Sequence, residues 1–274
     1  MDVSAYRNIV TVIRNYKGLS KNCLSILVNN FPHINHDTLY SILSLEYQKR
    51  MRMNHVKNQS VINKYWDVYQ DAVKTGAGPG IILRMAERFD ICPCLIAKLI
   101  LHKYFKECDM ELTQINAHLR DTSLIPDPHL AYEVFLCTIY DNLYSPLSET
   151  MKHSLGQEYE IKLHNEVLKL NLAFRDEEHL RKFGYDKTPD VKLDVPVAVD
   201  GFVINWIESK ALFGDDDVHI EYTKNQYLSY WNRFGPGLVI YWFGFVKSIV
   251  QADDKRFIIR DHMPTNIVHI NYLR

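Results

Sequence analysis

Residues 188–210 read TPDVKLDVPVAVDGFVINWIESK, and this stretch decides the fold. Its two apolar runs, rich in Val and Ile, predict two β-strands. The placement of charge within them is unusual. Asp190 stands at the start of the first run, and Glu208 and Lys210 stand near the end of the second, where an unpaired buried charge is costly.

The spacing of these charges predicts a shared site. Glu208 and Lys210 are two residues apart, so on a strand their side chains leave the same face. If the two strands pair as a hairpin, Asp190 lies beside Glu208. Two carboxylates at one place repel each other unless a cation joins them, and Mg²⁺, or Mn²⁺ in its place, prefers oxygen ligands. Together with the lysine, such a site suits phosphodiester hydrolysis.

The residues around this stretch predict an α/β domain with a mixed central sheet, which we place at residues 151–274. The apolar patterns indicate a helix from about Gly156, strands near 191–199 and 202–212, a helix at 219–234, and strands at 237–246 and near 256–261. The acidic run Asp215, Asp216, Asp217 is predicted to be a solvated loop.

The N-terminal part of the chain predicts a helical domain at residues 1–120, followed by a junction at 121–150 that contains three prolines. Apolar residues recur at helical spacing over 19–31, 36–53, 61–76, 81–89 and 94–106. Residues 81–105 have the form of a helix-turn-helix in which Pro93 opens the second helix, and residues 23–50 repeat the plan.

These helix pairs admit two interpretations. One is DNA binding, with Arg50, Arg52, Lys98 and Lys103 near phosphates. The other is a plain helical bundle. The segment CLIAKLIL (94–101) is more apolar than an exposed DNA-reading helix, which favours the second interpretation for that pair.

Composition narrows the class of protein. The chain has 274 residues, 47% of them hydrophobic, which is enough to form one large or two modest cores. Residues 1–120 carry 16 Lys/Arg against 10 Asp/Glu, whereas residues 121–274 carry 16 against 23, so a polyanionic partner suits the first part. Five cysteines without paired spacing argue against a disulfide framework and a structural zinc, and no apolar run predicts a membrane span. We therefore expect an intracellular protein.

The order TPD, apolar hairpin, ESK resembles the PD-(D/E)xK nuclease superfamily, whose core is restriction-endonuclease-like. Pro189 and Asp190 match the PD, and Glu208, Ser209 and Lys210 match the (D/E)xK. The resemblance implies that Asp190 and Glu208 hold a metal ion and that Lys210 acts with it in catalysis.

Two further segments fit the same resemblance. GQEYEIKL (156–163) is similar to the G-x-x-x-E-x-x-L opening of the superfamily's first core helix, which implies Glu160 as a further metal ligand, with Glu158 as the alternative. Gln226 and Tyr230 reproduce a QxxxY pattern of RecB-like members. That pattern implies Gln226 near the catalytic groups, although it can also be an ordinary polar helix residue.

The amino-acid sequence further resembles one eukaryotic branch of this superfamily, the TPD-motif family, over its whole length. This resemblance implies a protein of the nucleus and cytoplasm with codanin as a partner. The leading hypothesis is a Mg²⁺-dependent endonuclease, or a structure-specific DNase. The alternative is a scaffold of nuclease fold that hydrolyses little and instead binds and stabilises codanin.

Overall fold

The computed structural model describes residues 1–54, 59–108, 115–251 and 254–269. The chain forms two compact units, which we call the helical unit (Ile9–His153) and the C-terminal unit (Met1–Asn8 with Ser154–Arg274). Two helices, α1 (Val3–Asn15) and α9 (Pro146–Lys169), have residues in both units. Within the described ranges, no helix is long and apolar enough to cross a membrane.

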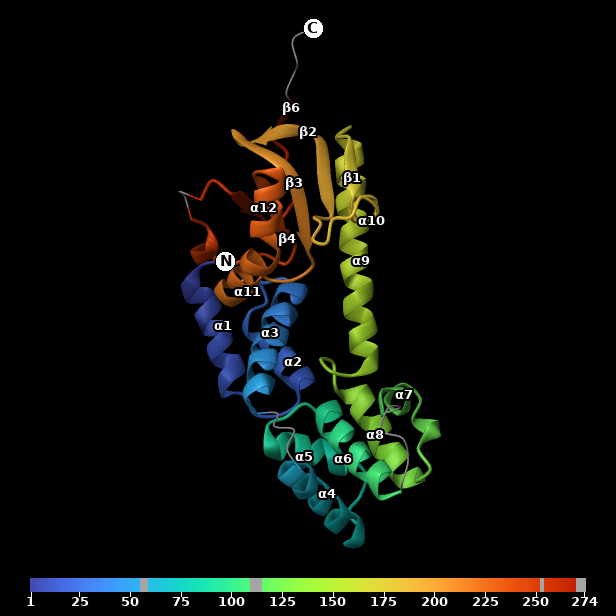
Figure 1. Ribbon diagram of the computed structural model, residues 1–274. Helices are drawn as coiled ribbons and strands as arrows, with labels where there is room; N and C mark the ends of the chain where they lie inside the picture. Colours follow the sequence, from blue (N-terminus) through green and yellow to red (C-terminus); the bar gives the residue numbers. More distant parts are fainter. Residues whose placement is uncertain (55–58, 109–114, 252–253, 270–274) are drawn as a thin grey trace. The chain divides into compact units, whose positions relative to one another are not determined.

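The helical unit contains the helices that the apolar spacing predicts between residues 19 and 106, and further helices after them (Figure 1). Its elements are α2 (Ser20–Asn30), α3 (His36–Asn54), α4 (Gln59–Lys74), α5 (Ile81–Phe89), α6 (Pro93–Glu107), α7 (Ile115–Arg120), η2 (Thr122–Leu124) and α8 (Pro128–Tyr140). Pro93 and Pro128 each open a helix, where their lack of an N–H costs nothing.

Two features of this unit bear on the predicted helix-turn-helix. Helix α6 is a core helix, because Ile96, Ile100 and Leu101 are fully buried. The Arg50 side chain is only 11% exposed; it forms a 3.0 Å ion pair with Asp90 in the turn before α6 and donates to a backbone carbonyl oxygen at 2.6 Å. Internal contacts therefore occupy Arg50, which corrects the expectation that it lies near phosphates.

The C-terminal unit is built on a mixed sheet with strand order β1-β2-β3-β4-β5, in which β6 also pairs with β2. The β1/β2, β2/β3 and β2/β6 pairs are antiparallel, whereas β3/β4 and β4/β5 are parallel. After α9, the elements are β1 (Phe174–Asp176), α10 (Glu177–Lys182), β2 (Val191–Val199), β3 (Phe202–Lys210), α11 (Asp216–Tyr222), the π-helical turn η3 (Thr223–Tyr227), α12 (Leu228–Phe234), β4 (Gly237–Tyr241), η4 (Lys247–Ile249), β5 (Phe257–Arg260) and β6 (Ile267–His269).

The predicted hairpin is formed by β2 and β3. Its two turn residues, Asp200 and Gly201, have φ angles of 52° and 82°, and left-handed conformation at both positions gives a turn whose twist matches that of paired strands. The pairing of Val191 with Ile207 extends by one step to place Asp190 opposite Glu208. The hairpin therefore brings the two acids together, as its apolar pattern predicts.

Helix α9 begins ten residues earlier than predicted, at Pro146 rather than at about Gly156. Ser145 Oγ accepts a hydrogen bond from the Ser148 N–H at 3.1 Å, and Pro146 occupies the first helical position, so the start signal lies there. Gly156 is an interior residue, where glycine costs about 1 kcal/mol relative to alanine. The burial of Leu163 further along the same helix offsets this cost.

The sheet lies between two helical layers (Figure 1). Apolar residues of α9 pack with one face, which includes Ile207, and aromatic residues of η3 and α12 pack with the other face, which includes Trp206. Because side chains alternate along a strand, Glu208 and Lys210 share the face of Trp206, while Ser209 shares the face that α9 covers. The predicted fold class, a helical N-terminal region followed by an α/β domain with a mixed sheet, is confirmed.

Candidate active site

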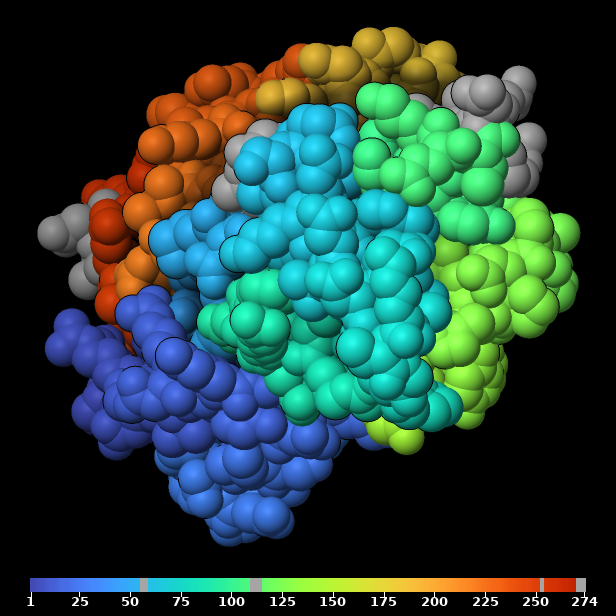
Figure 2. Space-filling model, turned by 90° about the horizontal axis from the view of Figure 1, so that it is seen from below, coloured from blue at the N-terminus to red at the C-terminus, as the bar shows by residue number. Residues whose placement is uncertain are grey.

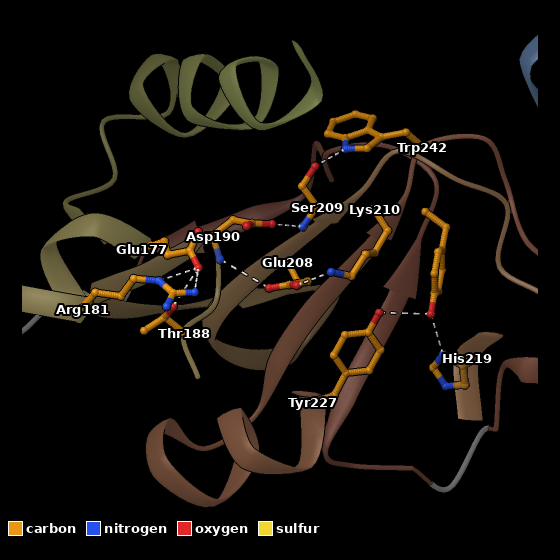
Figure 3. A network of polar contacts seen from close by, with 11 residues as sticks. Glu177, Arg181, Thr188, Asp190, Glu208, Ser209, Lys210, His219, Tyr227 and Trp242 are labelled. Atoms are coloured by element: carbon orange, nitrogen blue, oxygen red, sulfur yellow. Dashed lines mark hydrogen bonds and ion pairs between the residues drawn. The ribbon is translucent and has the colours of Figure 1, made fainter. Parts of the chain in front are cut away.

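The hairpin brings Asp190, Glu208 and Lys210 into one network (Figure 3). Lys210 Nζ donates to Glu208 Oε1 at 2.5 Å, and the Asp190 N–H donates to Glu208 Oε2 at 3.4 Å. The Ser209 N–H donates to Asp190 Oδ2 at 2.6 Å. A backbone N–H on each side of the hairpin thus binds the carboxylate from the other side, so the hairpin orients both acids.

Burial and mutual repulsion govern the charges of this network. Burial, followed by the nearby Glu208 charge, raises the pKa of Asp190 well above its ordinary value. Burial also raises the pKa of Glu208, against the opposing effect of the Lys210 ammonium. Burial alone would lower the pKa of Lys210, but the carboxylates of Glu208 and Asp190 outweigh it and raise that pKa. The lysine therefore stays charged, and the acids lack enough positive charge nearby.

A cavity of about 230 Å³ opens beside Asp190. Glu160 and His164, one turn apart on α9, line it together with an acidic segment on the opposite side, Asp176, Glu177 and Glu178. Glu158 is not among the lining residues. The geometry thus favours Glu160 over Glu158 as the acid available to the site, while its role as a metal ligand stays a prediction.

The acidic segment Asp176–Glu178 is absent from the site predicted from sequence. The β1/β2 pairing ends with Asp176 beside Val191, and Glu177, the next residue, lines the same cavity as Asp190. The Glu177 carboxylate accepts hydrogen bonds from Arg181 and Thr188. Strand β1 has three residues, too few to show the alternation of a strand. The only sequence signal for this segment is the run of acids at 176–178, which is typical of the start of a helix.

The donor set suits a hard divalent cation. Within the ranges that the structure describes, no three His, Cys, Asp or Glu side chains converge closely enough to hold a metal ion by themselves. Asp190 and Glu208 offer two carboxylates whose repulsion a cation would relieve. Mg²⁺ commonly binds one or two carboxylates and keeps water molecules and substrate phosphates as its other ligands, so the two acids fit Mg²⁺ or Mn²⁺.

Gln226 lies in the π-helical turn η3, and its Oε1 atom is buried without a hydrogen-bond partner among the described residues. That atom is therefore not bonded to Asp190, Glu208 or Lys210, and the role of Gln226 stays a prediction. Tyr230 of the same QxxxY pattern packs against Trp206 with ring centroids 5.3 Å apart. Burial, then the charges of Glu208 and Asp190, raises its pKa, so this tyrosine is near the acids.

Aromatic side chains contact the end of β3, which carries Glu208 and Lys210, on both faces of the sheet. On one face, Trp242 Nε1 donates to Ser209 Oγ at 2.8 Å. On the other face, Lys210 Nζ lies 4.6 Å from the centre of the Tyr222 ring. Figure 3 shows Ser209 pointing toward Trp242 and the Lys210 side chain turned toward Glu208.

The acidic run after β3 corrects one sequence expectation. Asp216 and Asp217 are exposed in the first turn of α11, but Asp215 is buried. Asp215 accepts hydrogen bonds from the Val218 N–H and from the hydroxyl of Tyr6, each at 2.9 Å. It caps a helix and binds the N-terminal segment, and therefore is not part of a solvated loop.

Two acids and a lysine on a β-hairpin of a mixed α/β sheet match the arrangement of the PD-(D/E)xK nuclease class, and Glu160 shares a cavity with Asp190 alone of these three. A family model described as "Protein of unknown function TPD sequence-motif" matches residues 126–263. The match spans about half of the chain, which therefore belongs to this TPD-motif family.

The relatives match over nearly the whole chain. The chain is 41% identical to CDAN1-interacting nuclease 1 of Danio rerio, over 96% of this chain and 89% of the relative. It is 44% identical to the Homo sapiens protein of that name, over 91% of this chain and 90% of the relative. No solved structure matches the chain. The chain therefore also belongs to the family of CDAN1-interacting nuclease 1 proteins, whose name describes nucleases that interact with CDAN1, that is, codanin.

Proposed function

We propose that this protein is a Mg²⁺- or Mn²⁺-dependent nuclease that hydrolyses phosphodiester bonds in DNA, with specificity for DNA structure. The observation that supports this most strongly is the hairpin register, which places Asp190 opposite Glu208 while Lys210 pairs with Glu208. Two buried acids beside one lysine cost stability, and strongly perturbed charged groups of this kind cluster at functional sites.

The residues of the site have distinct roles in this proposal. Asp190 and Glu208 would hold the ion, with Glu160 as an additional ligand, and the ion would supply polarisation of the phosphate. Lys210 stabilises negative charge on the phosphate in the transition state, and Glu208 keeps its ammonium in place. The Ser209 N–H orients the Asp190 carboxylate. Gln226 would approach the substrate from η3.

Codanin is the proposed protein partner, since the relatives are named for that interaction. The proposal also includes DNA contact by residues 1–120, which hold the surplus of Lys and Arg and most of which belong to the helical unit, and a location in both nucleus and cytoplasm. Because α6 is buried and Arg50 is paired internally, such DNA contact would use exposed cations of other segments.

A second function is favoured by one observation. The described residues offer no ready-made group of three metal-ligating side chains, and Lys210 already neutralises part of the charge on Glu208. The second function is that of a scaffold, which keeps the nuclease fold, hydrolyses little and stabilises codanin. A site with few metal ligands and an internally paired lysine is expected of such a scaffold.

Cleavage assays separate the two functions. Purified protein is incubated with single-stranded, duplex, flap and four-way-junction DNA, with Mg²⁺, Mn²⁺ or EDTA. The nuclease proposal expects metal-dependent cleavage that Asp190→Asn and Lys210→Met abolish. Asp194→Asn is the matched control, because Asp194 is an exposed acid of the same strand, paired with Arg175. Cleavage that persists in both site variants would refute the assignment, and failure to cleave any substrate would favour the scaffold.

A further inference from the structure

Helix α8 has an exposed apolar face that the proposed nuclease reaction does not use. Four large side chains of α8 are about half exposed: Tyr132 (51%), Phe135 (44%), Ile139 (50%) and Tyr140 (41%). The last three follow Tyr132 by three, seven and eight residues, a spacing that puts all four on one side of the helix. We call these four residues the α8 stripe. The rings of Tyr132 and Phe135 stack with centroids 6.3 Å apart. Large apolar side chains at this spacing normally pack against another element.

The charge distribution of α8 is equally unusual for a helix in contact with water. Its sequence, PHLAYEVFLCTIY, contains a single Asp, Glu, Lys or Arg, and that residue, Glu133, is buried. The Glu133 carboxylate accepts hydrogen bonds from the Gly80 and Ile82 N–H groups at 2.7 and 3.0 Å, at the start of α5. The charged residue therefore points into the helical unit, and the exposed side has no charge that would favour solvation.

The inner side of the same helix already forms part of the core, since Leu130, Val134 and Cys137 are fully buried. Helix α8 thus has apolar surface on two sides, and the helical unit covers one of them. In the space-filling view, the lime-green part of the chain that contains α8 lies at the edge of the face shown (Figure 2). The second side stays exposed among the described residues.

The size of the stripe indicates what kind of partner fits. If a fully exposed large side chain has about 200 Å², the exposed fractions leave roughly 400 Å², half of the about 800 Å² per partner that a stable interface buries. A second copy of the chain, packed through this stripe alone, would be held too weakly. An amphipathic helix binds along one apolar face of this kind, and a larger partner that supplies such a helix can add contacts outside the stripe.

We propose that the α8 stripe is the docking surface for an amphipathic helix of codanin. This inference depends on codanin being the partner, as proposed above. One end of the stripe also has a charge, because Lys21 Nζ lies 5.6 Å from the centre of the Tyr140 ring. The helix that docks there presents an apolar face with an acidic residue beside it, at the end that meets Lys21.

Binding measurements with purified codanin test this surface. Phe135→Ala/Ile139→Ala removes the centre of the stripe and is expected to weaken codanin binding at least tenfold in Kd by calorimetry. The matched control is Leu147→Ala/Met151→Ala, which removes two apolar side chains of similar exposure, also four apart, at the start of α9. The control should leave the Kd unchanged. Thermal melts must show both variants folded, and DNA cleavage must be equal in both.

The possible results distinguish this surface from the partner assignment. Unchanged codanin binding by a folded Phe135→Ala/Ile139→Ala variant refutes the surface alone. If the wild-type chain fails to bind codanin, both the surface and the proposed partner are refuted, while the nuclease assay still decides the nuclease function. A wild-type dimer that the stripe variant converts to a monomer, measured by light scattering, identifies a second copy as the occupant and also refutes the proposal.

Discussion

Replacing Lys210 with methionine tests whether the active-site network is held by charge. The Glu208 side chain is 3% exposed and that of Lys210 is 14% exposed, so the ion pair is largely shielded from water. Lys210→Met keeps the length of the side chain but leaves Glu208 buried next to Asp190 without its cation. Removing one partner of a buried pair costs about 3–5 kcal/mol, and the partial exposure of Lys210 favours the lower end, about 3 kcal/mol.

The assay is urea unfolding followed by tryptophan fluorescence, since Trp206, Trp231 and Trp242 all lie in the C-terminal unit. With a denaturant slope of about 2 kcal/mol/M, the loss lowers the unfolding midpoint by about 1.5 M. Adding Glu208→Gln to Lys210→Met is expected to restore most of the loss, because no uncompensated charge then remains at position 208.

The pH dependence of the same variant has a defined sign. Without the ammonium, the pKa of Glu208 in the folded state rises further above its value in the unfolded chain. The fold then binds a proton more readily than the unfolded chain, so lowering the pH from neutral toward the unfolded pKa of about 4.3 stabilises the variant relative to the wild type. The difference in urea midpoint between the wild type and Lys210→Met should therefore become smaller as the pH falls.

Two results would contradict this reasoning. One is a Lys210→Met variant that unfolds at the wild-type midpoint at pH 7. The other is a double variant, Glu208→Gln/Lys210→Met, that is no more stable than the single one. Lys182→Met, which breaks an exposed ion pair with Glu178 in the same unit, is the control and should leave the midpoint almost unchanged.

Four further substitutions, two tested singly and two as a pair, test packing and hydrogen bonding in the C-terminal unit. Gly237→Ala should lower the urea midpoint by at least the 1–3 kcal/mol of an overpacked core, because its Cβ would lie 2.1 Å from a ring carbon of Trp206; an unchanged midpoint would contradict the close contact. Gly156→Ala should stabilise the chain by about 1 kcal/mol, since no atom of the described residues outside the backbone of its own helix lies within 4 Å of the added carbon; a lowered melting temperature would show that the glycine is required. Trp242→Phe and Ser209→Ala each remove the same hydrogen bond, worth about 1 kcal/mol, between the two side chains. The loss of unfolding free energy in the double variant should therefore be smaller than the sum of the two single losses. Losses that add in full would show that the two side chains act independently.

The fold and the centre of the candidate site follow from local sequence patterns. The two strands of residues 191–210 have apolar runs long enough to identify, and their charges are noticeable because strand interiors rarely contain them. The hairpin pattern alone therefore predicts that Asp190, Glu208 and Lys210 lie together. Whether these residues bind a metal ion and cleave DNA stays a prediction.

The parts that could not be predicted depend on contacts between distant residues or on very short elements. Strand β1 has three residues and no detectable period, so the approach of Glu177 to Asp190 depends on a pairing that local sequence does not encode. Asp215 has a buried role because of Tyr6, which is 209 residues away along the chain. Gly156 suggested a helix start, although Ser145 provides the cap.

The contact between the first residues and the loop after β3 has a consequence for synthesis on the ribosome. Tyr6 stacks on Phe213 with ring centroids 5.7 Å apart and donates its hydroxyl to Asp215. At about 5–20 residues per second, translation delivers Asp215 roughly 10–40 s after Tyr6. During this interval the N-terminal segment has no docking site, so the C-terminal unit can be completed only after most of the chain has been made. This unit therefore cannot be transferred between proteins as one continuous piece of sequence.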